Sequence, residues 1–151
     1  MKKFLILAVL AIMAVGSANA QIQISEKKAK TVNVASVRAG YVSVYHNVGD
    51  RYWMALRSTN QFEDSLIIAL GKDKETAIKS IESFLSLLET MGKDESVDFN
   101  DGINDFHVSR DTMAGGAILI FSKANESHAG LYMLCKPDCK SAIKKFEKYV
   151  E

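Results

Sequence analysis

The second half of this 151-residue chain repeats the first half at an offset of 65 residues. Residues 73–85 (DKETAIKSIESFL) align without a gap on residues 138–150 (DCKSAIKKFEKYV), and five of the thirteen pairs are identical. The same offset also aligns apolar residues of earlier segments: Met54 with Leu119, Leu56 with Phe121, Leu66 with Leu131, and Ile68 with Met133. Two unrelated amphipathic helices can align by chance, but this match continues upstream of the helix without a gap. A fixed period is typical of a repeated structural unit, so we predict an internal duplication.

Each half predicts four strands followed by one helix. Segments rich in β-branched and aromatic residues, with turn residues between them, indicate strands at 31–37, 41–48, 52–58 and 65–70, and at 96–100, 105–110, 117–122 and 131–135. Apolar residues at steps of three and four indicate a helix from Lys74 to Met91, with Asp73 as its N-cap. The second helix is expected to start after Asp138. The predicted fold is therefore α+β, with two tandem β4-α repeats whose antiparallel sheets are each covered by one amphipathic helix.

Residues 1–20 have the pattern of a secretory signal peptide. Two lysines precede an apolar run at 4–15, and Ala18 and Ala20 fit the small-residue cleavage pattern. An uncleaved anchor is disfavoured because the run is shorter than the roughly 20 residues that span a bilayer. We expect an exported protein, periplasmic or secreted from a bacterium, that begins at Gln21 and has no membrane attachment after cleavage. The expected organisation is a signal peptide at 1–20, a short lead at 21–30, and one domain at 31–151 made of repeats 31–92 and 96–151.

Charge and motifs exclude several functional classes. The chain has 19 basic and 18 acidic residues, and cleavage after Ala20 removes two lysines, so the balance indicates no strongly charged partner. It contains no Gly-x-Ser-x-Gly, His-Glu-x-x-His, Walker-type or Cys-x-x-Cys motif. Its three histidines have no other ligand at the spacing that zinc sites use. We therefore predict a non-catalytic binding protein without cofactor or metal, whose partner is a protein or another macromolecule.

The hairpin at 41–58 carries the best candidate for a binding surface. A three-residue loop at 48–50 places five recognition-type side chains on one face: Tyr41, Tyr45, Arg51, Trp53 and Arg57. Tyr, Trp and Arg are enriched in binding hot spots, and aromatic rings also stack on nucleic-acid bases. A two-residue loop would mix the two faces of the hairpin. The alternative is that these aromatic residues pack against the sheet of the other repeat, or against a second protomer in a homo-oligomer.

This surface should be asymmetric between the repeats. At the offset of 65 residues, Ile118 stands in place of Trp53, and Ser122 in place of Arg57. Six acidic residues from Asp94 to Asp111 lie around the first strands of the second repeat and are interpreted as a solvated edge. We therefore expect binding to use the first repeat more than the second.

Two cysteines, Cys135 and Cys139, lie near the start of the last helix. An exported chain meets an oxidising compartment, which favours a disulfide between them. The closed ring is short, so its stabilising effect should be at the low end. Two alternatives stay open: free thiols, and a redox-active pair whose reactivity is raised by the helix N-terminus.

The order of elements, four strands and a helix repeated in tandem, resembles the Whirly family of single-stranded-DNA-binding proteins. The resemblance covers residues 31–151 and lies in the duplication and the element order. The Lys-Gly-Lys-Ala-Ala-Leu segment of plant Whirly proteins has no counterpart here, so no binding residue is carried over. The resemblance implies a single-stranded nucleic-acid binder as an alternative function. Export and a nearly neutral chain disfavour it, because phosphate binding draws on Lys and Arg.

Overall fold

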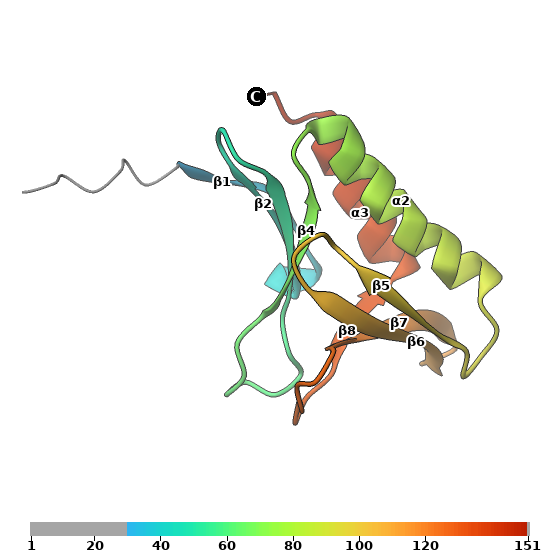
Figure 1. Ribbon diagram of the computed structural model, residues 1–151. Helices are drawn as coiled ribbons and strands as arrows, with labels where there is room; N and C mark the ends of the chain where they lie inside the picture. Colours follow the sequence, from blue (N-terminus) through green and yellow to red (C-terminus); the bar gives the residue numbers. More distant parts are fainter. Residues whose placement is uncertain (1–29, 151) are drawn as a thin grey trace, which may run out of the picture.

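A computed structural model describes residues 30–150 as two four-stranded antiparallel sheets, each followed by a helix (Figure 1). The first repeat consists of β1 (Thr31–Val37), a 3₁₀ turn η1 (Arg38–Gly40), β2 (Val42–Asn47), β3 (Tyr52–Leu56), β4 (Leu66–Gly71) and α2 (Lys74–Thr90). The second consists of β5 (Ser96–Asn100), β6 (Asp105–Met113), β7 (Gly116–Lys123), β8 (Tyr132–Cys135) and α3 (Lys136–Glu147). Strands follow sequence order in both sheets. The α+β class and the tandem β4-α architecture are confirmed; the signal peptide, residues 21–29 of the lead and residue 151 lie outside the described residues.

The β2–β3 hairpin has the three-residue loop that the sequence predicts. Val44 pairs with Met54 and Tyr45 with Trp53. The backbone N–H of Asn47 donates to the carbonyl of Arg51 at 3.0 Å, which leaves residues 48–50 as the loop. This register turns the apolar side chains of β2 and β3 toward the core and the aromatic–arginine set away from it.

The two repeats match element by element, but the ungapped offset of 65 residues is wrong for β8. In β3 and β7 it holds, since Met54 and Leu119 are both fully buried. In β4 it aligns buried Leu66 with Leu131, which is 41% exposed and lies just before β8. The buried residues of β8 are Tyr132 and Leu134. Because successive side chains of a strand point to opposite faces, the true offset here is one residue longer.

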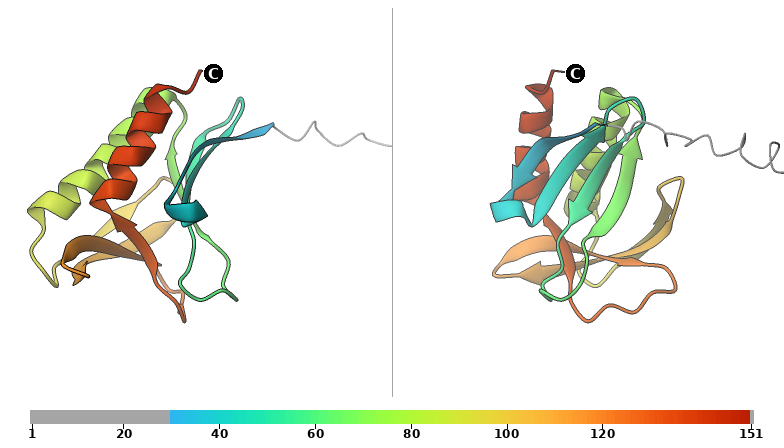
Figure 2. Two further views of the ribbon diagram at one scale, coloured as in Figure 1. Left: turned by 180° about the vertical axis from the view of Figure 1, so that it is seen from behind. Right: turned by 90° about the vertical axis from the view of Figure 1, so that its left-hand side faces the viewer.

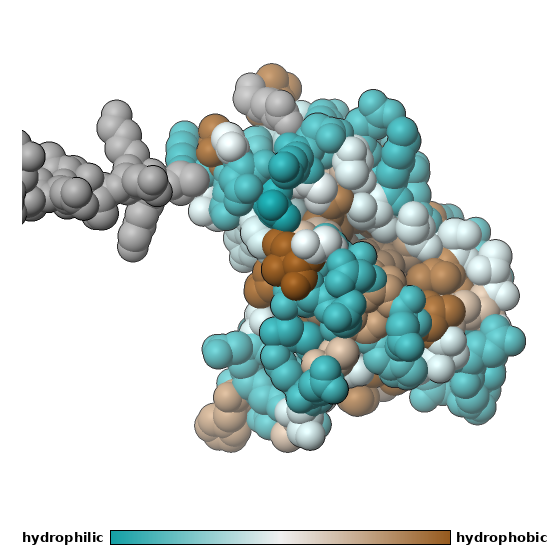
Figure 3. Space-filling view, viewed as in Figure 1, coloured by the Kyte–Doolittle hydropathy of each residue, from teal (hydrophilic) through white to brown (hydrophobic). Residues whose placement is uncertain are grey.

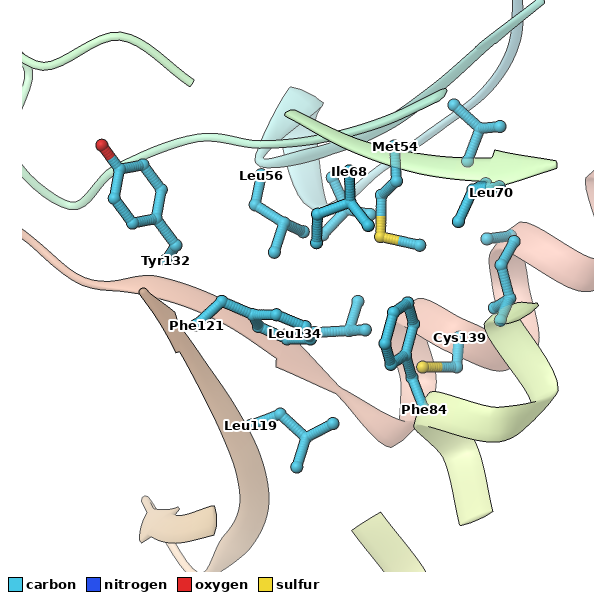
Figure 4. Packing of buried hydrophobic residues seen from close by; sticks show 14 of the residues in the cluster. Met54, Leu56, Ile68, Leu70, Phe84, Leu119, Phe121, Tyr132, Leu134 and Cys139 are labelled. Atoms are coloured by element: carbon cyan, nitrogen blue, oxygen red, sulfur yellow. The ribbon is translucent and has the colours of Figure 1, made fainter. Parts of the chain in front are cut away.

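The inner faces of the two sheets and both helices share one core. Figure 4 shows Met54, Leu56 and Ile68 of the first sheet facing Phe121 and Leu134 of the second. Helix α2 packs on β4 and β7, whereas α3 packs on β1, β2 and β8. The two helices lie side by side along the same side of the molecule (Figures 1 and 2). Each helix therefore ties the two repeats together.

Helix α3 begins at Lys136, three residues before the predicted start. Pro137 occupies its first turn, a position where the missing N–H of proline costs no hydrogen bond. Asp138, after which the sequence predicts the helix to start, lies in its first turn and accepts a hydrogen bond from the backbone N–H of Cys135 at 3.1 Å. The corresponding prediction for α2 is confirmed, because Asp73 caps it by accepting the N–H of Thr76 at 2.8 Å.

Candidate binding face and the cysteine site

The predicted aromatic side chains lie on the outer face of the first sheet. In the right-hand view of Figure 2 this sheet stands in front of the helices, which cover only its other face. Tyr41 is 37% exposed, and Tyr45 and Trp53 are half-buried. None of the three belongs to the shared core of residues 30–150. These residues therefore do not form the packing layer between the two sheets.

Arginine side chains lie over two of these rings. The guanidinium carbon of Arg51 is 5.4 Å from the ring centre of Trp53. Arg38 and Arg57 lie 5.5 and 5.6 Å from the ring centre of Tyr41. At these distances the cation is attracted to the face of the ring. We call Arg38, Tyr41, Tyr45, Arg51, Trp53 and Arg57 the aromatic–arginine face.

Arg38 is the member that the sequence analysis missed. It belongs to no alternating pattern, and its position depends on a turn in which Arg38 and Ala39 have φ of 48° and 52°. These left-handed values are uncommon for residues with a side chain. The turn lets Arg38 contact both Tyr41 and the second repeat. The sequence Arg-Ala-Gly between two strands marks a turn, but nothing in it predicts this contact.

Charge is distributed unequally over the two sheets. Residues 30–57, which contain β1 to β3, have four basic side chains and one acidic side chain. Residues 94–111 have six acidic side chains and one basic side chain. Hydrophilic residues cover most of the view in Figure 3, and apolar residues gather toward its middle, around β4, β5 and α2. Residues 30–57 thus carry a net positive charge, whereas residues 94–111 carry a net negative charge.

Both cysteines are free thiols in this structure. The thiol of Cys135 donates to Oδ2 of Asp138 at 2.9 Å, and Cys139 is fully buried in the core. Burial raises the pKa of Cys139 to about 12. Burial and the hydrogen bond to Asp138 also raise the pKa of Cys135. Since only the thiolate is a good nucleophile, this environment argues against the redox alternative, while the disulfide stays a prediction.

A carboxylate joins the long loops of the two repeats at the far end of the sheets. Glu63, between β3 and β4, accepts hydrogen bonds from the Ser58 hydroxyl at 2.6 Å and from the backbone N–H groups of Ala129 and Gly130. A side chain at Gly130 would collide with Ser58, so the close approach requires glycine. Nearby, Nε2 of His128 is buried without a hydrogen-bond partner in the described part of the chain. We interpret this cluster as a structural clamp.

Comparison of the chain with family models, curated proteins and solved structures found no match. Within residues 30–150, no three His, Cys, Asp or Glu side chains are placed to hold a metal ion. No helix in that range is long and apolar enough to cross a bilayer.

Proposed function

We propose that this is an exported, non-catalytic binding protein that recognises a macromolecular partner through the aromatic–arginine face. The observation that carries the proposal is the placement of Arg38, Arg51 and Arg57 over Tyr41 and Trp53 on a sheet face that the helices leave uncovered. Such a surface combines flat apolar area with fixed hydrogen-bond donors. These are the residue types that contribute most to binding energy at protein interfaces.

The charge of the face supports an acidic protein surface as the partner. A ring beneath a guanidinium group restricts its motion, so less conformational entropy is lost when a carboxylate binds. The only acidic side chain in residues 30–57 is Asp50, which pairs with Arg51 at 3.3 Å. Arg38 has its own carboxylate partner in the second repeat, but no carboxylate pairs with the Arg57 side chain among residues 30–150. Arg57 therefore offers a positive charge to a partner.

Single-stranded nucleic acid is the second candidate, favoured by the same rings. Exposed aromatic side chains beside cations can stack with bases while the cations contact phosphates. The element order that resembles the Whirly family agrees with this candidate. Binding of this kind weakens steeply with added salt, because each neutralised phosphate releases counterions.

The test is capture of partners from the exported fraction of the native host. Wild-type protein is compared with Arg51→Gln/Arg57→Gln, which removes two cations of the face, and with Lys93→Gln, an exposed substitution in the segment between the repeats. We expect the double variant to lose the partner and the control to retain it. Identical capture by all three proteins would contradict the proposal.

A titration separates the two candidates. Trp53 is the only tryptophan of the chain, so its emission reports on this face. If an oligothymidylate changes the emission, and if its affinity falls steeply with salt, nucleic acid becomes the favoured partner instead of a protein. No change with the oligonucleotide, together with capture of an acidic protein, supports the first candidate.

A further inference from the structure

A concave site lies where the two helices approach the β6–β7 hairpin. Its volume is about 660 Å³, within the size range of small-molecule sites. The last turn of α2, the hairpin and the first turn of α3 form its walls. Most of the lining is apolar and includes Leu88, Met113, Ala117, Ile118 and Pro137. The size and the lining of this cavity suit an acyl chain or a similar apolar group.

Two cations lie at the edge of this cavity. Lys136 is within 2.5 Å of the carboxylate of Glu89, and both side chains are about half exposed. Arg38 donates through Nη2 to the carbonyl of Met133 at 2.8 Å, and the same nitrogen is 3.4 Å from Asp138. The Nε and Nη1 groups of Arg38 have no partner within residues 30–150. The cavity edge therefore retains guanidinium donors for an anionic group.

The start of α3 lies at the same edge of the cavity. Lys136 is its first residue, and the unpaired N–H groups of a first helical turn favour negative charge nearby. Lys136 and Glu89 neutralise each other, and Asp138 pairs with Nη2 of Arg38, so Nε and Nη1 of Arg38 are the donors left for an anionic head group. Apolar walls with cationic donors at one edge are complementary to a ligand that has an apolar chain and one anionic head.

We propose that this cavity binds a small amphipathic carboxylate, such as a medium-chain acyl anion. The apolar chain packs against Leu88, Ala117 and Ile118, and the carboxylate accepts hydrogen bonds from Arg38 and Lys136. Hydrogen bonds between charged groups are the stronger class, so the head group should dominate selectivity. This proposal does not rest on a macromolecular partner for the aromatic–arginine face.

The affinity test compares decanoate with decanol by calorimetry on the reduced, signal-free protein. Decanoate should bind about tenfold more tightly, the effect of one charged hydrogen bond. Lys136→Ala should weaken decanoate binding about threefold, whereas Glu89→Gln should strengthen it about threefold, as expected for partly exposed charges. Neither variant should change decanol binding. Both positions are about half exposed, so the variants should fold.

A footprint locates the bound decanoate. Cys135 lines the cavity and Cys139 is fully buried, so at alkaline pH, where part of the Cys135 thiol is ionised, iodoacetamide should label Cys135 in the folded protein. Decanoate should slow this labelling, as measured by peptide mapping. Three results would each overturn the proposal: no binding of decanoate, equal binding of decanol, or binding that leaves the labelling of Cys135 unchanged. None of them bears on capture through Arg51 and Arg57, so the two proposals fail separately.

Discussion

Arg38, in the turn after β1, lies 3.4 Å from the carboxylate of Asp138 in the first turn of α3, and this contact joins the two repeats. The same Asp138 oxygen also accepts the backbone N–H and the thiol of Cys135. Asp138 is only 4% exposed, so its charge depends on these three donors. The start of α3 and the turn after β1 are thus held in place together.

We predict that Asp138→Ala lowers the free energy of unfolding by about 2 kcal/mol, because it leaves the partly buried N–H of Cys135 unpaired and removes a partner of Arg38. The loss of free energy is no larger because Arg38 is partly exposed, so solvent weakens its ion pair with Asp138. Asp73→Ala, which removes the exposed N-cap of α2, is the matched control and should cost less. Urea unfolding measures both. A smaller loss for Asp138→Ala than for Asp73→Ala would contradict the role given to Asp138.

The Glu63 clamp predicts a pH-dependent contribution to stability. Hydrogen bonds from Ser58 and from the N–H of Ala129 hold the pKa of Glu63 below its ordinary value of 4.5. A carboxyl group with a lowered pKa stabilises the fold above its unfolded pKa, and this contribution is lost as the pH falls through its folded pKa. Glu63→Gln should therefore lower the melting temperature at pH 7. The difference in melting temperature from wild type should shrink as the pH falls below the ordinary pKa of glutamate.

Thermal melts at a series of pH values measure that difference. Glu82→Gln, an exposed substitution on α2, corrects for the general effect of removing one negative charge. A difference between wild type and Glu63→Gln that stays constant from neutral to acidic pH would show that the carboxylate does not hold the loops.

Matching positions of the two helices should respond alike to truncation. Ile78 and Ile143 are both half-buried at the edge of the core, whereas Ile81 is fully buried. We expect Ile78→Ala and Ile143→Ala each to cost about 1–2 kcal/mol, and Ile81→Ala about 3–4 kcal/mol, because the cost grows with the cavity that is left. Denaturant unfolding tests the order. Unequal effects at Ile78 and Ile143 would show that the helices are not equivalent.

The sequence predicts the elements and the β2–β3 register because alternating apolar residues in that hairpin allow only one buried face. It does not predict the register of β8. Leu131, Tyr132, Met133 and Leu134 are all apolar, so either alternate pair could face the core. The repeat led to a helix start after Asp138 because Asp73 directly precedes α2. Cys135 is not a preferred N-cap, and Pro137 was the available signal for an earlier start. Arg38 was missed because its contacts cross between the repeats.

The thiols provide a test of the remaining enzymatic alternative. Because Cys139 has a pKa raised to about 12 and Cys135 is hydrogen-bonded to Asp138, both should be protonated at neutral pH. We therefore expect the protein not to accelerate insulin reduction by dithiothreitol. Acceleration that is lost in Cys135→Ser would reinstate the redox function. The predicted disulfide is tested by the intact mass of protein isolated from the native host, because a disulfide-bonded pair of cysteines has two hydrogens fewer than two free thiols.

The last prediction concerns Trp53, the only indole of the chain. Its ring is half-buried between a cross-strand neighbour, Tyr45, and the guanidinium group of Arg51. Its Nε1 is covered and has no hydrogen-bond partner within residues 30–150. We therefore expect emission that neutral acrylamide quenches in part, to an extent between that of a core indole and that of the unfolded chain.

A charged quencher adds a test of the surroundings. Because Arg51 lies over the ring, the ratio of iodide quenching to caesium quenching should be higher for Trp53 than for free tryptophan, since the cation attracts iodide and repels caesium. Arg51→Gln should remove this preference and raise quenching by acrylamide, because the indole loses its cover. Arg57→Gln, whose guanidinium group lies over Tyr41, is the matched control and should change neither measurement greatly. Blue-shifted emission from a proven monomer that no quencher reaches would place Trp53 in a closed environment and remove the basis for the aromatic–arginine face as a binding surface.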